Sequence, residues 1–353
     1  MVPSEFLTTP RTASDTVARP VAPTGGLRLM WALSILAVVL VVAAVLSTWI
    51  GYRPLDMDEL RNVEAARIVF FQLRLPRVLL AGIVGASLGS VGAALQAMFR
   101  NPLGEPFTLG VAGGGTLGAS VAIALGWGYP ILGVPPVFIA GFVGSGLAVC
   151  VVYRIAHSGS IVFPGTILLA GVAVNLTASA GVIVLQYLAD YTRALKMLRW
   201  TIGSLDIVGF ELIGSMLLLL IPGWFVLLWS LPDLHLMAMG EEVAASLGVN
   251  VSSREKWVFV AASLIVGVTV AVGGTIAFVG LIVPHTVRML FGEDVRIVVP
   301  CSFLLGASFL MGADTLARTL LGESELPVGA VTALSGGLMF LWLLRKRQKY
   351  SAF

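Results

Sequence analysis

The sequence predicts an all-α polytopic membrane protein with about ten transmembrane helices. Hydrophobic residues make up 58% of the 353 residues and charged residues only 12%, about half the charged fraction of a typical soluble domain. Several uncharged runs reach the ~20 residues that one span requires. The 40 glycines are typical of membrane helices that pack closely. So few charges exclude a soluble enzyme and a disordered chain.

Uncharged runs place five spans in the first half of the chain. The first span covers residues 29–50 and the second covers 78–99. Residues 106–153 are also uncharged, which is too long for one helix, so they are expected to form a hairpin. Its turn is predicted at residues 126–130, where glycine and proline cluster. The fifth span covers residues 158–189.

The second half contains five further apolar runs. The paired glycines at 273–274 predict a break between the seventh and the eighth span, because glycine interrupts a helix. The sixth to tenth spans are expected at residues 212–231, 257–274, 275–290, 297–313 and 326–344.

An even number of spans places both termini on the same side of the membrane. The terminal segments are basic, which predicts a cytoplasmic location for both. Residues 1–28 are rich in Pro, Thr, Ala and Ser and are expected to form a mobile cytoplasmic tail. Residues 29–345 then form the transmembrane domain, and residues 346–353 form a basic cytoplasmic tail.

Arginines are concentrated in the segment between the first two spans, on the outer side of the membrane. One interpretation is solvated charge balanced by neighbouring acids, and the other is a docking surface for an acidic partner. The arginines of this segment are Arg53, Arg61, Arg67, Arg74 and Arg77.

The inner loop at residues 232–256 contains a predicted short helix. Its acids, Glu241 and Glu242, lie in the first turn, and Gly248 provides a C-terminal stop. A helix outside the bilayer has no lipid in which to bury an apolar face, so docking to another protein is one interpretation. An amphipathic surface helix is the other.

Several kinds of chemistry lack their sequence signals. No Gly-Lys pair occurs, so no phosphate-binding P-loop of that type exists and the chain is not expected to hydrolyse ATP. The histidines lack metal-ligand spacing, so neither a metal site nor a cofactor is expected. Ser87 lies in a Gly-x-Ser-x-Gly pattern, and an intramembrane serine protease would need it to meet His285 or His157. The alternative is that small residues of this segment (Gly82, Gly85, Gly89 and Ala93) form a stripe for tight helix contact.

Seven motifs in order along the chain resemble the FecCD-type permease family, the membrane subunits of type II ABC importers. The motifs are Arg74-Leu75-Pro76-Arg77, Gln96-x-x-Phe99-Arg100-Asn101-Pro102-Leu103, Trp200-x-x-Gly203-Ser204-Leu205, Gly240-Glu241-Glu242-Val243-Ala244 to Leu247-Gly248, Gly274-x-Ile276-x-Phe278-Val279-Gly280-Leu281-Ile282-Val283-Pro284-His285-x-x-Arg288, Ala313-Asp314-x-x-Ala317-Arg318 and Glu325-Leu326-Pro327-Val328-Gly329-x-Val331-Thr332-Ala333.

The resemblance implies a ten-helix permease in a bacterial or archaeal cytoplasmic membrane. It implies inward transport of a bulky metal chelate, with a ferric siderophore ahead of haem or cobalamin. The implied partners are two cytoplasmic ATPases, an extracytoplasmic binding protein and a second copy of the chain, but no nucleic acid. An ion-coupled secondary transporter is the alternative; it would place ionisable residues near the middle of a span, whereas Asp314 and Arg318 fall near a helix end.

The resemblance also implies roles for particular residues. Binding-protein docking falls to Arg74, Arg77 and Arg318. The cytoplasmic gate comprises Leu103, Pro164 and Gly165. The helix that couples to the ATPase comprises Gly240, Glu241, Glu242, Val243, Ala244, Ala245, Ser246, Leu247 and Gly248.

Overall fold

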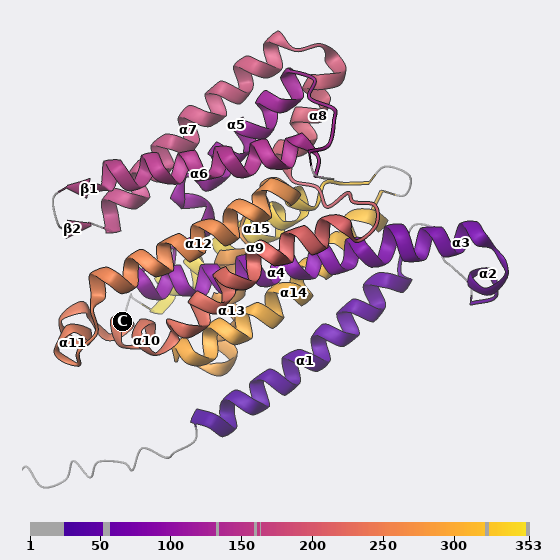
Figure 1. The fold of residues 1–353 in the computed structure, drawn as a ribbon. Helices are drawn as coiled ribbons and strands as arrows, with labels where there is room; N and C mark the ends of the chain where they lie inside the picture. The colour runs from indigo at the N-terminus through magenta and orange to yellow at the C-terminus, as the bar shows by residue number, and fades with distance from the viewer. Residues whose placement is uncertain are drawn as a thin grey trace, which may run out of the picture.

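A computed structural model describes residues 25–51, 57–131, 134–158, 161–162, 164–321 and 325–350. The chain is a bundle of helices (Figure 1). Most of the predicted tail, residues 1–24, lies outside this part, as do residues 351–353 of the C-terminal tail. The last helix continues through residues 346–350, so this part of the basic segment is helical.

Ten apolar helices correspond to the ten predicted spans. Within the described residues, seven are long and apolar enough to cross a membrane, and three are shorter apolar helices. This pattern confirms the predicted fold class. The ten helices are α1 (Gly25–Trp49), α4 (Leu75–Met98), α5 (Val111–Ala124), α6 (Pro136–Ala156), α7 (Pro164–Leu188), α9 (Glu211–Trp229), α12 (Val251–Gly273), α13 (Val279–Phe291), α14 (Val295–Thr319) and α15 (Val328–Tyr350).

Short elements that the apolar runs did not predict join these helices. They are α2 (Met57–Asn62), α3 (Glu64–Ile68), the π-helical turn η1 (Val69–Arg74), the 3-10 turn η2 (Pro106–Leu109), the strands β1 (His157–Ser158) and β2 (Ile161–Val162), α8 (Tyr191–Ile202) and α10 (Leu231–Met239). The remaining short helix, α11 (Glu241–Ser246), is the predicted one. α8 is strongly amphipathic, so it carries no long apolar run that would reveal it. Asp190 caps α8 by accepting a hydrogen bond from the backbone N–H of Arg193.

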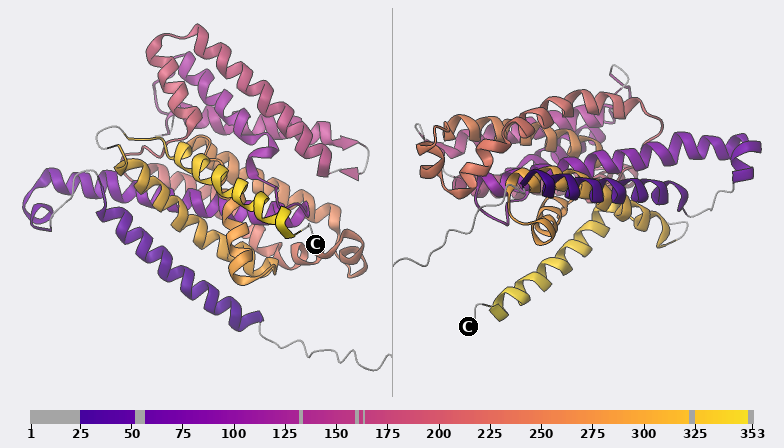
Figure 2. Two further views of the ribbon diagram at one scale, coloured as in Figure 1. Left: turned by 180° about the vertical axis from the view of Figure 1, so that it is seen from behind. Right: turned by 90° about the horizontal axis from the view of Figure 1, so that it is seen from below.

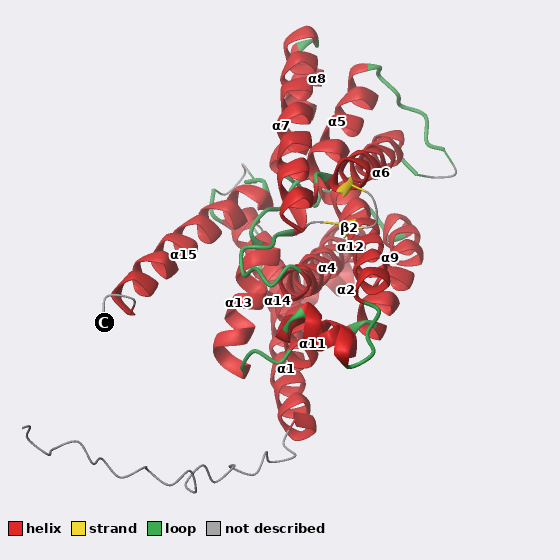
Figure 3. Cartoon of the chain, turned by 90° about the vertical axis from the view of Figure 1, so that its left-hand side faces the viewer, coloured by secondary structure: helices red, strands yellow, loops and turns green. Residues whose placement is uncertain are grey.

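Helix α4 lies at the centre of the bundle. In its most apolar window 89% of the residues are buried, against 11% for α1. Figure 1 shows α12, α13 and α14 alongside α4, with α5, α6, α7 and α8 forming a second group beside α12. Figures 2 and 3 show α15 diverging from the bundle. α4 therefore joins α12, α13 and α14, whereas the second group is joined to the bundle through α12.

Small residues allow α4 to approach its neighbours closely, as the stripe predicted. A Cβ added at Gly85 would collide with the backbone carbonyl of Gly306 on α14, and one at Gly92 would collide with Gly280 on α13.

The position of Ser87 in α4 tests the protease interpretation. This serine lies in the middle of α4, fully buried, and its hydroxyl has no hydrogen-bond partner among the described residues. A nucleophile elbow needs a strand-to-helix turn, so the protease interpretation is wrong.

The predicted glycine break is also confirmed. α12 ends at Gly273, and Gly274 adopts a left-handed conformation with φ +68°. A Cβ on Gly274 would meet the carbonyl oxygen of Trp200 at the end of α8. Only glycine fits this position, because both the dihedral angle and the close approach exclude a side chain.

The two ends of the bundle differ in their elements. α10 and α11 lie at one end, together with the C-terminal end of α15, and α2 and α3 lie at the other (Figure 1). The N-terminal end of α1 lies toward the α11 end of the bundle. Both described ends of the chain therefore lie toward the same side, as an even number of spans requires.

Candidate docking, coupling and gate sites

A cavity of about 750 Å³ opens at the end of the bundle that holds α2 and α3. Charged side chains dominate its polar lining. We call it the outer cavity; its charged residues are Arg74, Arg77, Arg199, Arg318, Asp206 and Glu325. The lining therefore has a net charge of +2, from four arginines and two carboxylates. The structure brings the three predicted docking arginines together here.

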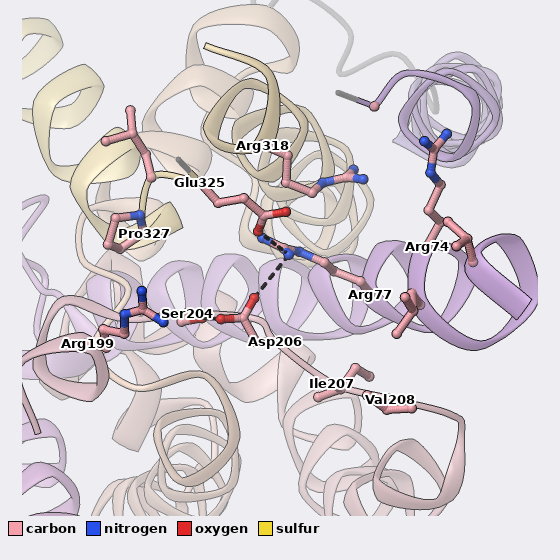
Figure 4. Close-up of a pocket in the computed structure, with 14 residues that line it drawn as sticks. Arg74, Arg77, Arg199, Ser204, Asp206, Ile207, Val208, Arg318, Glu325 and Pro327 are labelled. Carbon is pink, nitrogen blue, oxygen red and sulfur yellow. Dashed lines mark hydrogen bonds and ion pairs between the residues drawn. The ribbon is translucent and has the colours of Figure 1, made fainter. Parts of the chain in front are cut away.

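Arg77 is the centre of an ion-pair network in the outer cavity. Its Nη1 lies 3.0 Å from Asp206 Oδ1 and 2.7 Å from Glu325 Oε2. Figure 4 shows these two carboxylates reaching Arg77 from the loops that precede α9 and α15. Both are exposed, with 62% and 49% of their side-chain surface accessible. Water and a partner protein can therefore compete for Arg77.

A third carboxylate lies behind Arg77, inside the protein. Asp314 is fully buried, and its Oδ1 lies 3.1 Å from Arg77 Nε. Its Oδ2 lies 2.9 Å from Nε of Arg318, one turn further along α14. The Nη2 of Arg318 also donates to the carbonyl of Ser47 and to the Thr315 hydroxyl. A buried charge requires such partners, so Asp314 holds both arginines in place.

Arg74 occupies the end of the π-helical turn η1. Its Nη1 donates to the carbonyl of Trp49 at 3.3 Å, which ties η1 to the end of α1. Arg74 and Arg318 are both buried, with 8% and 6% of their surface exposed. Arg199 is exposed and is not among the residues that the sequence pattern predicted for this site. Its position directly before the Trp200 motif is the signal that could have indicated it.

The short helix predicted in the inner loop is present as α11 at the opposite end of the bundle, and its coupling role stays a prediction. Gly240 with φ +139° precedes it, and Gly248 with φ +89° follows it, as the predicted glycine stop requires. Ala244 is fully buried against the bundle. Val243 and Leu247 are 44% and 62% exposed. Exposed apolar side chains on a helix outside the bilayer form a surface suited to a protein partner.

The rest of α11 presents polar and small groups. Glu242, Ala245 and Ser246 are exposed, whereas Glu241 is half-buried. Beside α11, His235 of α10 lies 3.4 Å from Asp294, the residue that caps α14. Hydrogen bonds from Arg296 hold the pKa of Asp294 below its usual value, so this carboxylate stays ionised. α10, which supports α11, thus has a polar contact with the start of α14.

The loop after α4 carries the predicted gate residue Leu103. α4 ends with two hydrogen bonds of the Schellman type: Asn101 N–H donates to Gln96 and Arg100 N–H donates to Ala97. Arg100 is left-handed with φ +49°, a conformation that costs a residue with a Cβ about 1 kcal/mol. Leu103 is 52% exposed, and its N–H donates to Asn101 Oδ1 at 2.9 Å.

The other two gate residues begin α7. Pro164 is the first residue of the helix, and its side chain lies outside the described part. Gly165 is exposed, and a Cβ added there would meet no atom within 4 Å. Leu103 and Gly165 are thus both accessible on the single chain, and their role in a gate stays a prediction.

The FecCD transport family matches residues 29–346 of the chain. The hemin transport system permease protein HmuU of Yersinia pestis is 36% identical over 90% of this chain and 97% of its own length. The vitamin B12 import system permease protein BtuC of Klebsiella pneumoniae is 35% identical over 88% and 92%. The Fe(3+)-citrate import system permease protein YfmE of Bacillus subtilis is 34% identical over 90% and 96%.

A solved structure agrees with these relatives. It is described as a metal-chelate type ABC transporter in an inward-facing conformation. It is 31% identical in sequence, covers 90% of this chain and 99% of its own, and superimposes with a TM-score of 0.77. The similarity therefore extends over most of this chain and nearly all of the solved one.

Proposed function

The chain belongs to the FecCD transport family, and from this premise we propose that it is the permease subunit of an importer that carries a bulky metal chelate into the cell. It is a multi-pass protein of the cell inner membrane, and in this family the ATPase is a separate subunit. The named cargoes of three relatives, hemin, vitamin B12 and Fe(3+)-citrate, are all bulky metal chelates. We expect a ferric siderophore first and haem or cobalamin as the alternatives.

The single observation that carries the proposal is the exposed apolar surface of α11. Leu247 and Val243 are accessible at the end of the bundle where α10 and α11 lie outside the spans. We infer that an ATPase covers this surface, one for each of two permease subunits. The permease itself is proposed to hydrolyse no ATP, which the missing Gly-Lys pair supports. Residues 29–345 form the permease domain, and residues 1–28 and 346–353 form its cytoplasmic tails.

At the outer end we propose that an extracytoplasmic binding protein docks through its own carboxylates. Arg74, Arg77 and Arg318 supply the positive charge, and the lining charge of +2 supports the assignment. Because Asp206 and Glu325 already pair with Arg77, the partner's carboxylates have to compete with them. The gate is proposed at Leu103, Pro164 and Gly165, where the two copies of the chain approach each other at the cytoplasmic end.

The proposal is tested in proteoliposomes that contain the permease with its partner ATPase, with the cognate binding protein supplied on the side of the membrane opposite the ATPase. ATP on the cytoplasmic side should drive uptake of a radiolabelled ferric chelate, and the permease alone should hydrolyse no ATP. Uptake driven by a proton or sodium gradient without ATP would instead establish the secondary transporter.

The α11 surface has its own test. Glu242→Lys combined with Leu247→Asp should prevent co-purification of the ATPase or uncouple hydrolysis from uptake. A carboxylate at position 247 would lose its hydration beneath a docked partner. Full uptake by this double variant would contradict the assignment of α11. Lys256→Ala, an exposed change on the neighbouring α12, serves as the control.

A further inference from the structure

Arg100 stands where the backbone favours glycine. It is the residue after the C-cap of α4, and its φ of +49° is one of only two positive values among non-glycine residues in the described part of the chain. Glycine is the usual residue at this position of a Schellman motif, because it has no Cβ to clash with the backbone. The positive φ at Arg100 therefore indicates that the arginine side chain has a role at this position.

That side chain connects two elements that are far apart in the sequence. Arg100 Nη2 forms an ion pair with Oε1 of Glu241, the first residue of α11. Both partners are close to half exposed. Glu255, in the first turns of α12, is near enough to interact electrostatically with both of them. The guanidinium of Arg100 is thus paired at the start of α11 and lies near the start of α12.

The loop that follows is a tight hydrogen-bonded turn. Asn101 Oδ1 accepts from Leu103 N–H at 2.9 Å, and the Asn101 carbonyl accepts from Gly104 N–H at 3.0 Å. Leu103 is therefore fixed relative to Asn101, which directly follows Arg100. A shift of the backbone at Arg100 must move Leu103 with it.

We propose that Arg100 is a positioning residue that ties the loop carrying Leu103 to α11 through Glu241. A displacement of α11 pulls on the Arg100 guanidinium and so changes the position of Leu103. This inference rests on the proposed function, in which an ATPase moves α11 and Leu103 belongs to the gate. It adds the physical connection between the two sites.

The test uses the reconstituted complex of the permease, ATPase and binding protein, and measures chelate taken up per ATP hydrolysed. Arg100→Gly keeps the cap and relieves the backbone strain, so a structural role predicts an intact or more stable protein. The tie predicts that uptake per ATP falls at least fivefold. Arg100→Glu and Glu241→Arg should each lower the ratio, and the two together should restore it to within twofold of wild type.

Arg154→Ala is the matched control, since it removes an exposed arginine near the last turn of α6 and should leave the ratio unchanged. A wild-type ratio in Arg100→Gly overturns the inference. So does a charge swap that is no better than the single changes. Failure of the wild-type complex to move any metal chelate would overturn the proposed function, and this inference with it.

Discussion

Asp314→Asn removes the one fully buried charge of the outer network while keeping the shape of the side chain. Asp314 is 0% exposed and lies within 3.1 Å of Arg77 Nε and 2.9 Å of Arg318 Nε. Breaking a buried ion pair from one side costs about 3–5 kcal/mol, because the remaining charge stays buried without a partner. Arg318, with 7% of its side chain exposed, is the group left in that state.

The free energy of unfolding, measured by titration with denaturing detergent in mixed micelles, should therefore fall by about 3–5 kcal/mol. Asp206→Asn is the matched control. Its side chain is 62% exposed and also pairs with Arg77, and an exposed pair contributes about 0–1 kcal/mol. Both variants remove one carboxylate from Arg77, but only Asp314→Asn also leaves the buried Arg318 without its carboxylate, so the difference between them measures the cost of that orphaned charge.

A double variant separates the orphaned charge from lost packing. Asp314→Asn with Arg318→Gln removes both charges of the buried pair, so its loss should be smaller than the sum of the two single losses by about 0.5–3 kcal/mol. If Asp314→Asn costs no more than Asp206→Asn, or if the single losses simply add, Asp314 does not hold the two arginines in place.

Three further predictions concern other parts of the molecule. A Cβ at Gly92 would collide with the carbonyl oxygen of Gly280, so Gly92→Ala should lower the unfolding free energy by about 1–3 kcal/mol, whereas Gly146→Ala, with no atom within 4 Å, should not. Leu103→Trp should block chelate uptake while ATP hydrolysis continues, and uptake at the wild-type rate would reject the gate. In a background lacking both native cysteines, a protein with Leu103→Cys and Gly165→Cys should form a disulfide cross-link between subunits in at least one nucleotide state. If no cross-link forms in any nucleotide state, the proposed subunit contact is wrong.

Removing carboxylates from the outer cavity should strengthen, and not weaken, the docking of the binding protein. Asp206→Asn with Glu325→Gln removes two exposed carboxylates that occupy Arg77, so the affinity for an acidic partner should rise and its decrease with salt should steepen. Surface plasmon resonance on the permease in nanodiscs measures both. Glu211→Gln, an exposed change at the start of α9, is the control. An unchanged or weaker affinity would place the docking surface elsewhere.

The spans could be predicted from the sequence because the bilayer selects for long apolar runs. The same reasoning found the Gly273 break and the contact stripe on α4, since each depends on residue types that are local in sequence. α8 was missed because charged residues recur every third position along it (Arg193, Lys196 and Arg199), which is typical of the polar face of an amphipathic helix and interrupts any long apolar run. Its place between two long spans gave no signal of its own.

The ion-pair networks could not be predicted from the sequence, since each depends on which distant residues the fold brings together. In the sequence, nothing distinguishes Asp206 and Glu325 from other acidic residues in loops, and only the fold brings both beside Arg77. The arginines of the first outer segment were predicted as one group, yet Arg53 lies outside the described residues, and Arg67 lines a different, smaller cavity. Arg74 and Arg77 both line the outer cavity because they lie three residues apart, at the end of η1 and in the first turn of α4, which follows it directly.

Helix α4 gives these sites a common physical basis. A buried helix in a membrane cannot carry unpaired charge along its length, so its charged residues are confined to its two ends. Arg77 lies at the outer end, within the ion-pair network, and Arg100 follows the inner end, paired with Glu241 of α11. The 24 residues of α4 span about 36 Å at 1.5 Å per residue, and glycines lock the helix against α13 and α14. A rigid helix of that length moves as one unit, so a displacement at one end also displaces the other end. On the proposed function, docking at the outer cavity and movement of α11 act on the same helix, so Gly92→Ala should weaken the response of ATP hydrolysis to the binding protein as well as the stability of the fold.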